Sequence, residues 1–511
     1  EGDCKACYRR VREMRSQGIR PDLLTYNLLM ESCAVAGEWK TAVKVLKEMK
    51  DWFIEPDIRT YIHAIKACQK DAEWRQALKL FREMSNDKNE IIPSPQSYTV
   101  VITVCGHAKK WKQAVELYKE MPRNGIRPNI YTCTAAITAC VKAGRGNEAL
   151  EIFDQMSNQG VAPTVITYNL ALSACSKSGK WKQALTLLQN MCTNGFEPNL
   201  ISYSTAISAC ERVGKWEDAL RIFEQMDENN VTPNVIAFST AISACAKGGQ
   251  PLRAVEILDS MPQKGVEPNL YCYSAAISAC AQQGMWKESL KLLQQMSIKG
   301  VRADDIVLKT ILQGCAHAGK WLEAYKLLLD MNARGFGFDR TSYNWAIMAC
   351  EKDKQWKHAM YLLQDMQLKD IDPDEHTYTT IMKSCGYQWL EVLQILKQVK
   401  RSRVVPNEAM YTVAVNSCIA DGESSQAWQL IQEMHTRKLR PNTYTYNGAI
   451  KSCRKHDNMK LAIVLLNDMI RHNVAANSYT RDLALNLCST KGQRNLVNRL
   501  LKETVRSKYE A

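Results

Sequence analysis

The sequence predicts an all-α protein, a right-handed α-solenoid of stacked helix-turn-helix repeats. Three observations predict this fold. A cysteine returns every 35 residues along most of the 511-residue chain, apolar residues around it follow a helical period, and each repeat closes on a helix-capping residue. A fixed period of this length is typical of repeat arrays, because a single helical hairpin buries its apolar face only against neighbouring hairpins.

The recurring cysteine defines the repeat. Eleven of the thirteen intervals are 35 residues, one is 37 and one is 33. The series is Cys33, Cys68, Cys105, Cys140, Cys175, Cys210, Cys245, Cys280, Cys315, Cys350, Cys385, Cys418, Cys453 and Cys488. We interpret these cysteines as small apolar fillers, and since each lies one repeat from the next, we expect no disulfides and a reducing compartment. Cys4 and Cys7 form a single C-x-x-C without a second pair, so no metal site is predicted there.

Residues 200–234 show the elements in order. Tyr203 and Cys210 share one face of a predicted first helix, which ends at Gly214. A second helix then runs past Met226, and a proline closes the repeat before Asn234, a residue suited to the N-cap of the next helix.

This pattern divides the whole chain. Residues 1–22 match the second half of a truncated repeat, and residues 478–511 form a diverged C-terminal repeat that caps the stack. Because the sequence starts inside a repeat and without Met, we expect a targeting segment and further repeats upstream. Repeats 1 to 13 begin at Leu23, Ile58, Pro95, Ile130, Val165, Leu200, Val235, Leu270, Asp305, Arg340, Glu375, Glu408 and Thr443.

Three repeats are irregular. Repeat 2 is two residues longer around residues 86–92, and repeat 11 is two residues shorter between Cys385 and Leu390, so both are expected to bend the stack locally. In repeat 9, Leu308 and Lys309 replace the usual tyrosine and small polar residue.

Two further stripes are expected to pack inside the stack. We expect the methionine at the twenty-seventh position to pack in the hydrophobic core. Tryptophan opens the second helix at the seventeenth position, on the far side of the hairpin from the expected concave surface, so we expect packing between hairpins rather than base stacking. These residues are Trp39, Trp74, Trp111, Trp181, Trp216, Trp286, Trp321 and Trp356.

Charge and composition limit the function. The net charge of +14 and the pI near 8.9 suggest a polyanionic partner, with nucleic acid as the first candidate. We expect no membrane span, cofactor, metal or small-molecule substrate. The eight histidines do not form the zinc motif of a deaminase tail, and the 34 residues after Asn477 are too few for a catalytic domain, so no enzyme is predicted.

Several positions together resemble the pentatricopeptide repeat family in its uniform 35-residue form, the P-class. They are tyrosine at the fourth, glycine at the fifteenth, alanine at the twentieth and methionine at the twenty-seventh position, followed by the closing Pro-Asn or Pro-Asp. A tetratricopeptide array has a 34-residue period and lacks this closing pattern. Proteins of this family are the known case of one RNA base read per helical repeat by two or three side chains.

The resemblance implies that the fifth and last residues of each repeat face the base edge. We call the last residue the closing residue. The pairs are Asn27 with Asp57, Ile62 with Ser94, Thr99 with Asn129, Thr134 with Thr164, Asn169 with Asn199, Ser204 with Asn234, Ser239 with Asn269, Ser274 with Asp304, Lys309 with Asp339, Asn344 with Asp374, Thr379 with Asn407, Thr412 with Asn442, and Asn447 with Asn477. Under the family's pairing rules they imply the RNA site 5′-U-?-A-?-C-A-A-G-?-U-A-A-C-3′, with repeats 2, 4 and 9 off the pattern.

Capping alone explains the closing position, because all thirteen closing residues are Asp, Asn, Ser or Thr. It does not explain the fifth position. Eleven of thirteen repeats place Asn, Ser or Thr there, inside a helix where each is less favourable than Ala. Because this loss of helix stability is repeated at one inward-facing position, we infer that these residues read bases.

Two other positions complete the predicted site. Aliphatic or aromatic second residues are expected to pack on base planes, at Leu24, Tyr131, Ile166, Ile201, Ile236, Tyr271, Ile306 and Tyr444, and Arg59 and Gln96 suit this role less. The thirteenth position is basic in seven repeats, at Lys70, Lys142, Lys177, Arg212, Lys247, Lys352 and Lys455. These residues either contact phosphates or form a solvated face. Seven phosphate contacts would give log affinity against log salt a slope of about −5.

The predicted function is therefore sequence-selective binding of single-stranded RNA in an organelle, mitochondrion or plastid, in RNA stabilisation, processing or translation. The alternative is a structural subunit of an organellar ribosome or other large assembly that contacts ribosomal RNA or protein partners.

Overall fold

The computed structural model describes residues 4–85, 91–337, 339–402, 404–488 and 490–506. These residues form 29 α-helices and one 3-10 helix and contain no strand, so the predicted all-α repeat fold is confirmed. Part of the stretch that lengthens repeat 2 (residues 86–90) and the end of the capping repeat (residues 507–511) lie outside the described residues. No helix in the described part of the chain is both long and apolar enough to span a bilayer.

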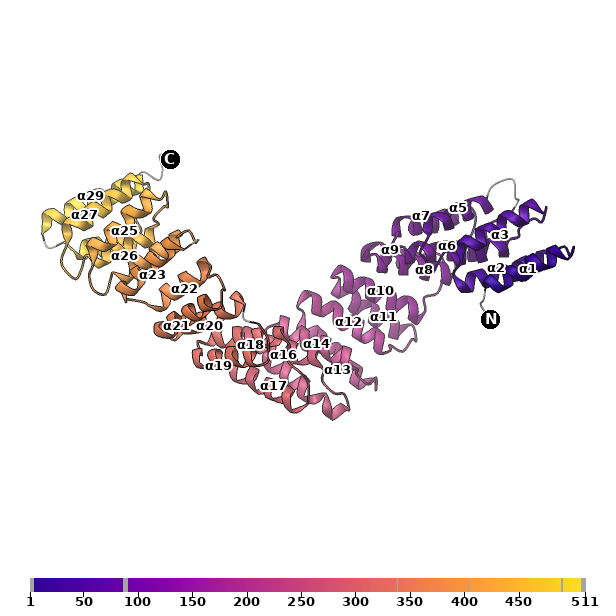
Figure 1. Ribbon diagram of the computed structural model, residues 1–511, viewed down its shortest axis with the longest axis horizontal. Helices are drawn as coiled ribbons and strands as arrows, with labels where there is room; N and C mark the ends of the chain where they lie inside the picture. The colour runs from indigo at the N-terminus through magenta and orange to yellow at the C-terminus, as the bar shows by residue number, and fades with distance from the viewer. Residues whose placement is uncertain (1–3, 86–90, 338, 403, 489, 507–511) are drawn as a thin grey trace. The chain divides into compact units, whose positions relative to one another are not determined.

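The chain divides into an N-terminal body, residues 1–272, and a C-terminal body, residues 273–511. Each body is a stack of antiparallel helical hairpins (Figure 1). The helix α16 contains the boundary between them.

The first helix of each hairpin begins at the first residue of a repeat. These helices are α2 (Leu23–Ala36), α4 (Ile58–Ala67), α6 (Pro95–His107), α8 (Ile130–Lys142), α10 (Val165–Ser178), α12 (Leu200–Val213), α14 (Val235–Lys247), α16 (Leu270–Gln282), α18 (Asp305–Ala318), α20 (Arg340–Lys352), α22 (Glu375–Ser384), α24 (Glu408–Ser417), α26 (Thr443–Ser452) and α28 (Ser478–Asn486).

The second helices alternate with them, and most begin at the tryptophan of the seventeenth position. They are α1 (Cys4–Ser16), α3 (Trp39–Asp51), α5 (Trp74–Met84), α7 (Trp111–Arg123), α9 (Gly146–Asn158), α11 (Trp181–Thr193), α13 (Trp216–Glu228), α15 (Pro251–Ser260), α17 (Trp286–Ile298), α19 (Trp321–Ala333), α21 (Trp356–Leu368), α23 (Trp389–Arg401), α25 (Ser424–Thr436), α27 (Met459–Arg471) and α29 (Lys491–Arg506). The 3-10 helix η1 (Pro262–Lys264) follows α15.

Local chemistry sets where the helices begin and end. The Asn199 carboxamide oxygen accepts hydrogen bonds from the backbone N–H groups of Ile201 and Ser202, at 3.0 and 3.1 Å, and so caps α12. At the other end of α12, Gly214 has φ 73°, a left-handed conformation that glycine adopts without a Cβ penalty. The chain then turns and starts α13.

The first helices form one continuous row in each body. Within the N-terminal body α2 packs on α4, α4 on α6 and so on to α14, and within the C-terminal body α18 to α28 do the same. Within the described residues of each body, successive second helices approach each other most closely from α25 to α27 and from α27 to α29. Neighbouring repeats are therefore joined mainly through their first helices.

The recurring cysteines lie inside this packing. All fourteen are buried. Burial raises the pKa of the Cys210 thiol to about 12 and that of Cys245 to about 11, so these side chains stay neutral and pack as small apolar groups.

The tryptophans pack between hairpins, as expected. Each is half-buried at the start of a second helix. A basic residue of the next repeat lies over several of the rings: Lys215 Nζ is 5.6 Å from the centroid of Trp181, and Arg145 Cζ is 5.0 Å from that of Trp111.

The tyrosine at the fourth position ties the two helices of a hairpin together. Its ring is buried, and its hydroxyl is hydrogen-bonded to a side chain near the end of the second helix. The pairs are Asn124 donating to Tyr98 at 2.9 Å, Asn194 to Tyr168 at 2.8 Å and Asn229 to Tyr203 at 2.9 Å, and Tyr411 donating to Glu433 at 2.9 Å and Tyr446 to Asp468 at 2.6 Å.

The buried thiols give a direct test of the packing. Only Cys7 and Cys192 of the nineteen cysteines are exposed. We expect a thiol reagent such as Ellman's reagent, at about pH 8, to label two cysteines rapidly and the other seventeen only after denaturation. Rapid labelling of many more than two in the native protein would contradict this packing.

The same thiols predict loss of stability in alkali. An unfolded cysteine loses its proton near pH 9, whereas a buried one such as Cys210 holds it to about 12. Because the native state then binds more protons than the unfolded chain, the free energy of unfolding falls as the pH rises through this window. Urea unfolding at a series of pH values would show the fall, and a flat profile above pH 9 would contradict it.

Candidate nucleic-acid interface

A row of exposed apolar side chains follows the first helices. The predicted base-packing residues are 59 to 72% exposed: Leu24, Tyr131, Ile166, Ile201, Ile236, Tyr271, Ile306 and Tyr444. Single exposed apolar residues are ordinary, but a series that repeats once per hairpin at one helical position forms a stripe that a partner can cover. Flat base rings are suitable occupants.

Asparagine at the fifth position is held by the next repeat. In repeat 1, the Thr60 hydroxyl donates to Asn27 Oδ1 at 2.7 Å, and Asn27 Nδ2 donates to Asp57 Oδ2 at 3.2 Å. The same arrangement recurs with Ser202 and Asn169 at 2.6 Å, Thr377 and Asn344 at 2.6 Å, and Thr480 and Asn447 at 2.7 Å. Because the oxygen accepts this bond, the amide's NH₂ group is oriented as the donor beside the closing residue.

The hydroxyls that orient these amides belong to third residues, which the sequence-based prediction did not include. They are buried at the start of the first helices, and in repeat 2 Thr60 forms a capping box with Asp57. The Ser or Thr three residues after a closing Asp or Asn was the signal that could have identified them.

Serine and threonine at the fifth position bind their own helix instead. Thr134 Oγ1 donates to the Ile130 carbonyl at 2.6 Å, Ser204 Oγ to the Leu200 carbonyl at 2.7 Å, and Thr379 Oγ1 to the Glu375 carbonyl at 2.6 Å. The repeats therefore fall into two chemical classes: those presenting a held amide donor and those presenting a compact hydroxyl.

The closing residues cap and also face the fifth residue. Asp374 Oδ1 accepts from the Thr377 N–H at 2.8 Å and lies 3.5 Å from Asn344 Nδ2. Burial alone would raise the pKa of Asp374, but the hydrogen bonds from Thr377 and Asn344 hold it below its ordinary value. An Asp at this position therefore keeps a second charged acceptor oxygen, whereas a capping Asn keeps an NH₂ donor.

Several fifth residues depart from this picture. Ile62 is buried and apolar. Lys309 is ion-paired with Asp339 at 2.8 Å and with Asp305 at 2.5 Å, so both members of the repeat 9 pair are already engaged. The patterned residues Ser239, Thr412 and Asn447 are 5 to 9% exposed in this structure.

Two grooves bring the predicted positions together, one in each body. In the N-terminal body, a groove of about 250 Å³ is lined by Thr99 and Thr134, Tyr131, and the thirteenth residues His107 and Lys142. In the C-terminal body, a groove of about 760 Å³ is lined by residues that include Thr412, Asn407, Asn442 and Tyr444. Second, fifth and thirteenth residues thus line one surface in the first groove, and second, fifth and closing residues line one surface in the second.

The basic thirteenth residues have a structural role as well. Four donate to a carbonyl near the end of the preceding repeat's first helix: Lys70 to Ala36, Lys177 to Val141, Lys352 to His317 and Lys455 to Ala420. Such carbonyls have no partner within the helix, so a lysine there is stabilising. An ammonium has three N–H donors and keeps its charge, so these lysines can still face an anion.

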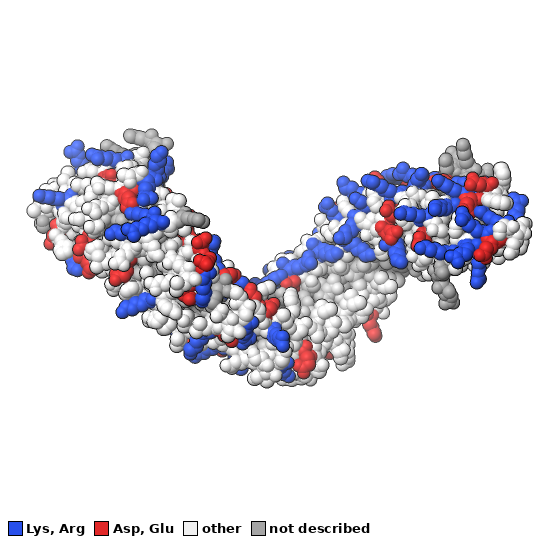
Figure 2. All heavy atoms as spheres, in the orientation of Figure 1, with Lys and Arg blue, Asp and Glu red and all other residues white. Residues whose placement is uncertain are grey.

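Three thirteenth residues differ from those four. Lys142 and Arg212 are exposed, and Lys247 is ion-paired with Glu211 at 2.6 Å. Lysine and arginine side chains also gather over α5, α7 and α9 on the face of the N-terminal body shown in Figure 2.

The C-x-x-C pair does not converge on a metal site. Cys4 is buried with its sulfur 2.9 Å from that of Cys33, whereas Cys7 is exposed.

Comparisons with known proteins agree with this geometry. A model of the pentacotripeptide-repeat region of PRORP matches residues 169–334 and 338–510, which is 339 of the 511 residues. The pentatricopeptide repeat domain model matches residues 51–108 and 116–178, and two further pentatricopeptide repeat models match residues 21–70 and 96–126. Among curated proteins, no sequence matches the chain.

Solved structures give the same fold. The chain is similar to the pentatricopeptide repeat protein PPR10 from maize, with 22% identity and a TM-score of 0.50 over 98% of this chain and 76% of that one. A structure of PPR10 in complex with an 18-nt psaJ RNA element matches with 22% identity and a TM-score of 0.43, over 99% of this chain and 83% of that one. The matching family models and the repeat geometry together place the chain: it belongs to the pentatricopeptide repeat family.

Proposed function

We propose that the protein binds single-stranded RNA by sequence, one base per repeat, without catalysing a reaction. The observation that carries the proposal is the set of an exposed apolar second residue, a held polar fifth residue and a closing residue with one polar group to spare, as in Ile166, Asn169 and Asn199 of repeat 5. This set supplies a surface for the base plane and two polar groups for its edge. The family's reading of one base per repeat supports it.

The second polar group of the closing residue can distinguish U and G from C and A. On their Watson–Crick edges, U and G carry a ring N–H donor, whereas C and A carry a ring nitrogen acceptor. The second carboxylate oxygen of a capping Asp accepts from U or G, and the NH₂ of a capping Asn donates to C or A. Capping fixes either side chain in place, so little conformational entropy is lost on binding.

The fifth residue suits the second choice, between large and small bases. The hydroxyls of Ser204 and Thr379 stay close to their own helix through bonds to carbonyls four residues back, which leaves room for a purine. The Asn344 amide extends further and is held as a donor, which suits the O2 carbonyl of a pyrimidine.

The biological role proposed is that of the family. By occupying a segment of an organellar transcript, the protein would block exonucleases, remodel RNA structure, or position a processing or translation factor. Its basic net charge favours association with RNA generally.

The first prediction of the proposed function concerns the preference for an RNA sequence. We expect the full chain to bind the 13-nucleotide RNA U-N-A-N-C-A-A-G-N-U-A-A-C at least about tenfold, or 1.4 kcal/mol, more tightly than a scramble of equal composition. Fluorescence anisotropy at about 150 mM salt would measure it. Equal or absent binding would instead favour a structural subunit of an organellar ribosome or other large assembly.

The second prediction concerns one closing residue. Asp374→Asn keeps the cap, because Asn and Asp cap equally well, but replaces the spare acceptor with a donor. The tenth base should then change from U to C, with a preference of roughly tenfold. The matched control is Asp339→Asn in repeat 9, where Lys309 occupies the fifth position, and this variant should not change the preference at the ninth base. An unchanged preference in Asp374→Asn would contradict base reading at this pair.

The third prediction concerns phosphates. Lys247 is ion-paired with Glu211 and Lys455 with Asp421, so five thirteenth residues remain and the slope of log affinity against log salt should be about −3.5. Lys142→Ala should make that slope less steep by about 0.7, whereas Lys247→Ala should leave it nearly unchanged. Equal effects of the two variants would show that the groove position of Lys142 does not matter.

A further inference from the structure

Some successive repeats are joined on their second-helix side by a carboxylate that faces cations. At the junction of repeats 11 and 12, Glu433 lies 2.6 Å from Lys400 Nζ and accepts from Arg437 Nε at 3.2 Å and from Tyr411 at 2.9 Å. Burial alone would raise the pKa of Glu433, but the hydrogen bonds from Lys400 and Tyr411 hold it below its ordinary value. Two permanent positive charges thus neutralise this half-buried carboxylate.

The cation from the preceding repeat recurs in the N-terminal body. Arg15 lies 3.0 Å from Glu48, and Lys50 is ion-paired with Glu83. Each cation lies seven residues before a closing residue, and each carboxylate is the twenty-sixth residue of the next repeat. This ion pair therefore belongs to the repeat geometry.

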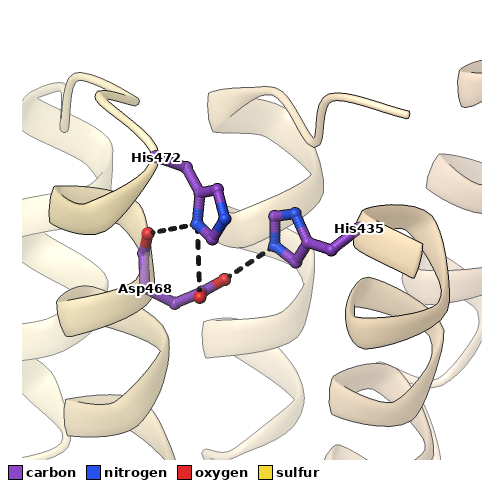
Figure 3. Close-up of side chains that lie close together, drawn as sticks. All are labelled: His435, Asp468 and His472. Atoms are coloured by element: carbon purple, nitrogen blue, oxygen red, sulfur yellow. Dashed lines mark hydrogen bonds and ion pairs between the residues drawn. The ribbon is translucent and has the colours of Figure 1, made fainter. Parts of the chain in front are cut away.

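At the junction of repeats 12 and 13, histidines replace both cations. His435 occupies the position of Lys400, His472 that of Arg437, and Asp468 that of Glu433. His435 Nε2 lies 3.0 Å from Asp468 Oδ2 and His472 Nδ1 lies 3.3 Å from Asp468 Oδ1 (Figure 3). Tyr446 donates to Asp468 Oδ2 at 2.6 Å, as Tyr411 does to Glu433.

The two histidine rings lie very close together. They stack with centroids 3.8 Å apart and an angle of 15° between planes. Two separate positive charges at this distance would repel each other. A single divalent cation supplies both positive charges at one point. The Asp468 side chain is only 10% exposed, so water stabilises its negative charge poorly and a bound cation would stabilise it.

We propose that His435, Asp468 and His472 bind one first-row transition-metal ion, with Zn²⁺ as the first candidate. Imidazole and carboxylate are ligands that Zn²⁺ accepts. One ligand atom from each residue lies within 4.8 Å of the others. The separation of 3.0 Å between His435 Nε2 and Asp468 Oδ2 is close to the edge of a zinc tetrahedron, which is about 3.3 Å for ligand bonds of about 2.0 Å.

The surrounding bonds support metal binding. His472 Nδ1 lies 3.0 Å from the Asp468 carbonyl oxygen, and donating to it leaves Nε2 with the lone pair that a metal needs. The Tyr446 hydroxyl holds the carboxylate in place, a support typical of metal ligands. Because nearly parallel rings cannot both aim at one ion, the His472 ring, the more exposed of the two, turns on binding, and water completes the fourth position.

The bound ion would cross-link repeats 12 and 13. His435 comes from the end of α25, and Asp468 and His472 lie four residues apart at and just beyond the end of α27. Successive second helices approach each other closely at this end of the C-terminal body. The site lies on the second-helix side, so binding should not depend on the RNA-facing residues of the first helices.

The experiment is a zinc titration of the metal-free full chain at about pH 7.5 by isothermal calorimetry. The chain carries Cys7→Ser and Cys192→Ser, which remove the two exposed thiols. We expect one bound equivalent and a raised Tm. His435→Lys with His472→Arg recreates the Lys400 and Arg437 arrangement, so this double variant should keep its helical circular dichroism and lose the zinc equivalent.

Two further variants complete the test. His456→Gln, a change at an exposed histidine of the same repeat, should bind zinc as the parent chain does. His472→Gln alters only the most exposed ligand and should weaken zinc binding at least about tenfold. Zinc binding that is absent in the parent chain, or unchanged in either ligand variant, would overturn the proposal.

Discussion

A buried tyrosine hydroxyl needs a hydrogen-bond partner, and in the repeats that carry tyrosine at the fourth position this requirement ties the two helices of the hairpin together. Cys133, Phe238 and Leu308 take that position in repeats 4, 7 and 9. Leaving a buried hydroxyl unpaired costs about 1–3 kcal/mol, which one hairpin in a thin core cannot easily offset. The partner stands at the end of the second helix: Asn229 for Tyr203, Glu433 for Tyr411. The bond joins the end of the second helix to the first helix, next to the loop that leads to the closing residue.

One closing side chain can serve both the fold and the proposed recognition of RNA. Its first polar atom is committed to the cap, as Asp374 Oδ1 is to the Thr377 N–H at 2.8 Å. The cap does not use the second polar atom, and that atom is where Asp and Asn differ. Because either residue caps well, an exchange of Asp and Asn would change the proposed base preference of one repeat without loss of the helix start. The third-residue hydroxyl extends this arrangement across the repeat boundary, because Thr60 also fixes the Asn27 amide.

The period made the fold predictable from sequence, since a hairpin of fixed length has few ways to bury one apolar stripe. The cysteines, the tryptophans and the exposed second residues were predictable for the same reason. Contacts across repeat boundaries were not. Nothing local shows that Lys177 donates to the Val141 carbonyl, that Lys247 pairs with Glu211, or that Ser239 and Asn447 lie buried, because each depends on how the next repeat packs. The histidine cluster was missed because His435 lies 33 residues from Asp468 in the sequence.

The two helix rows of the solenoid are free to change separately. First helices carry the proposed base-reading residues and pack in one row, so we expect a substitution there to act on RNA binding and on neighbouring repeats together. The ends of the second helices contact the next repeat through a few side chains, and the chain places different chemistry there: Arg15 with Glu48, Lys400 with Glu433, His435 with Asp468. The tyrosine hydroxyl contacts the carboxylate in the last two of these junctions, so that bond sets the geometry and the cation varies. On the proposed metal binding, a junction completed by a metal ion can therefore arise from two substitutions, Lys or Arg to His, without disturbing the proposed RNA-facing residues of the first helices.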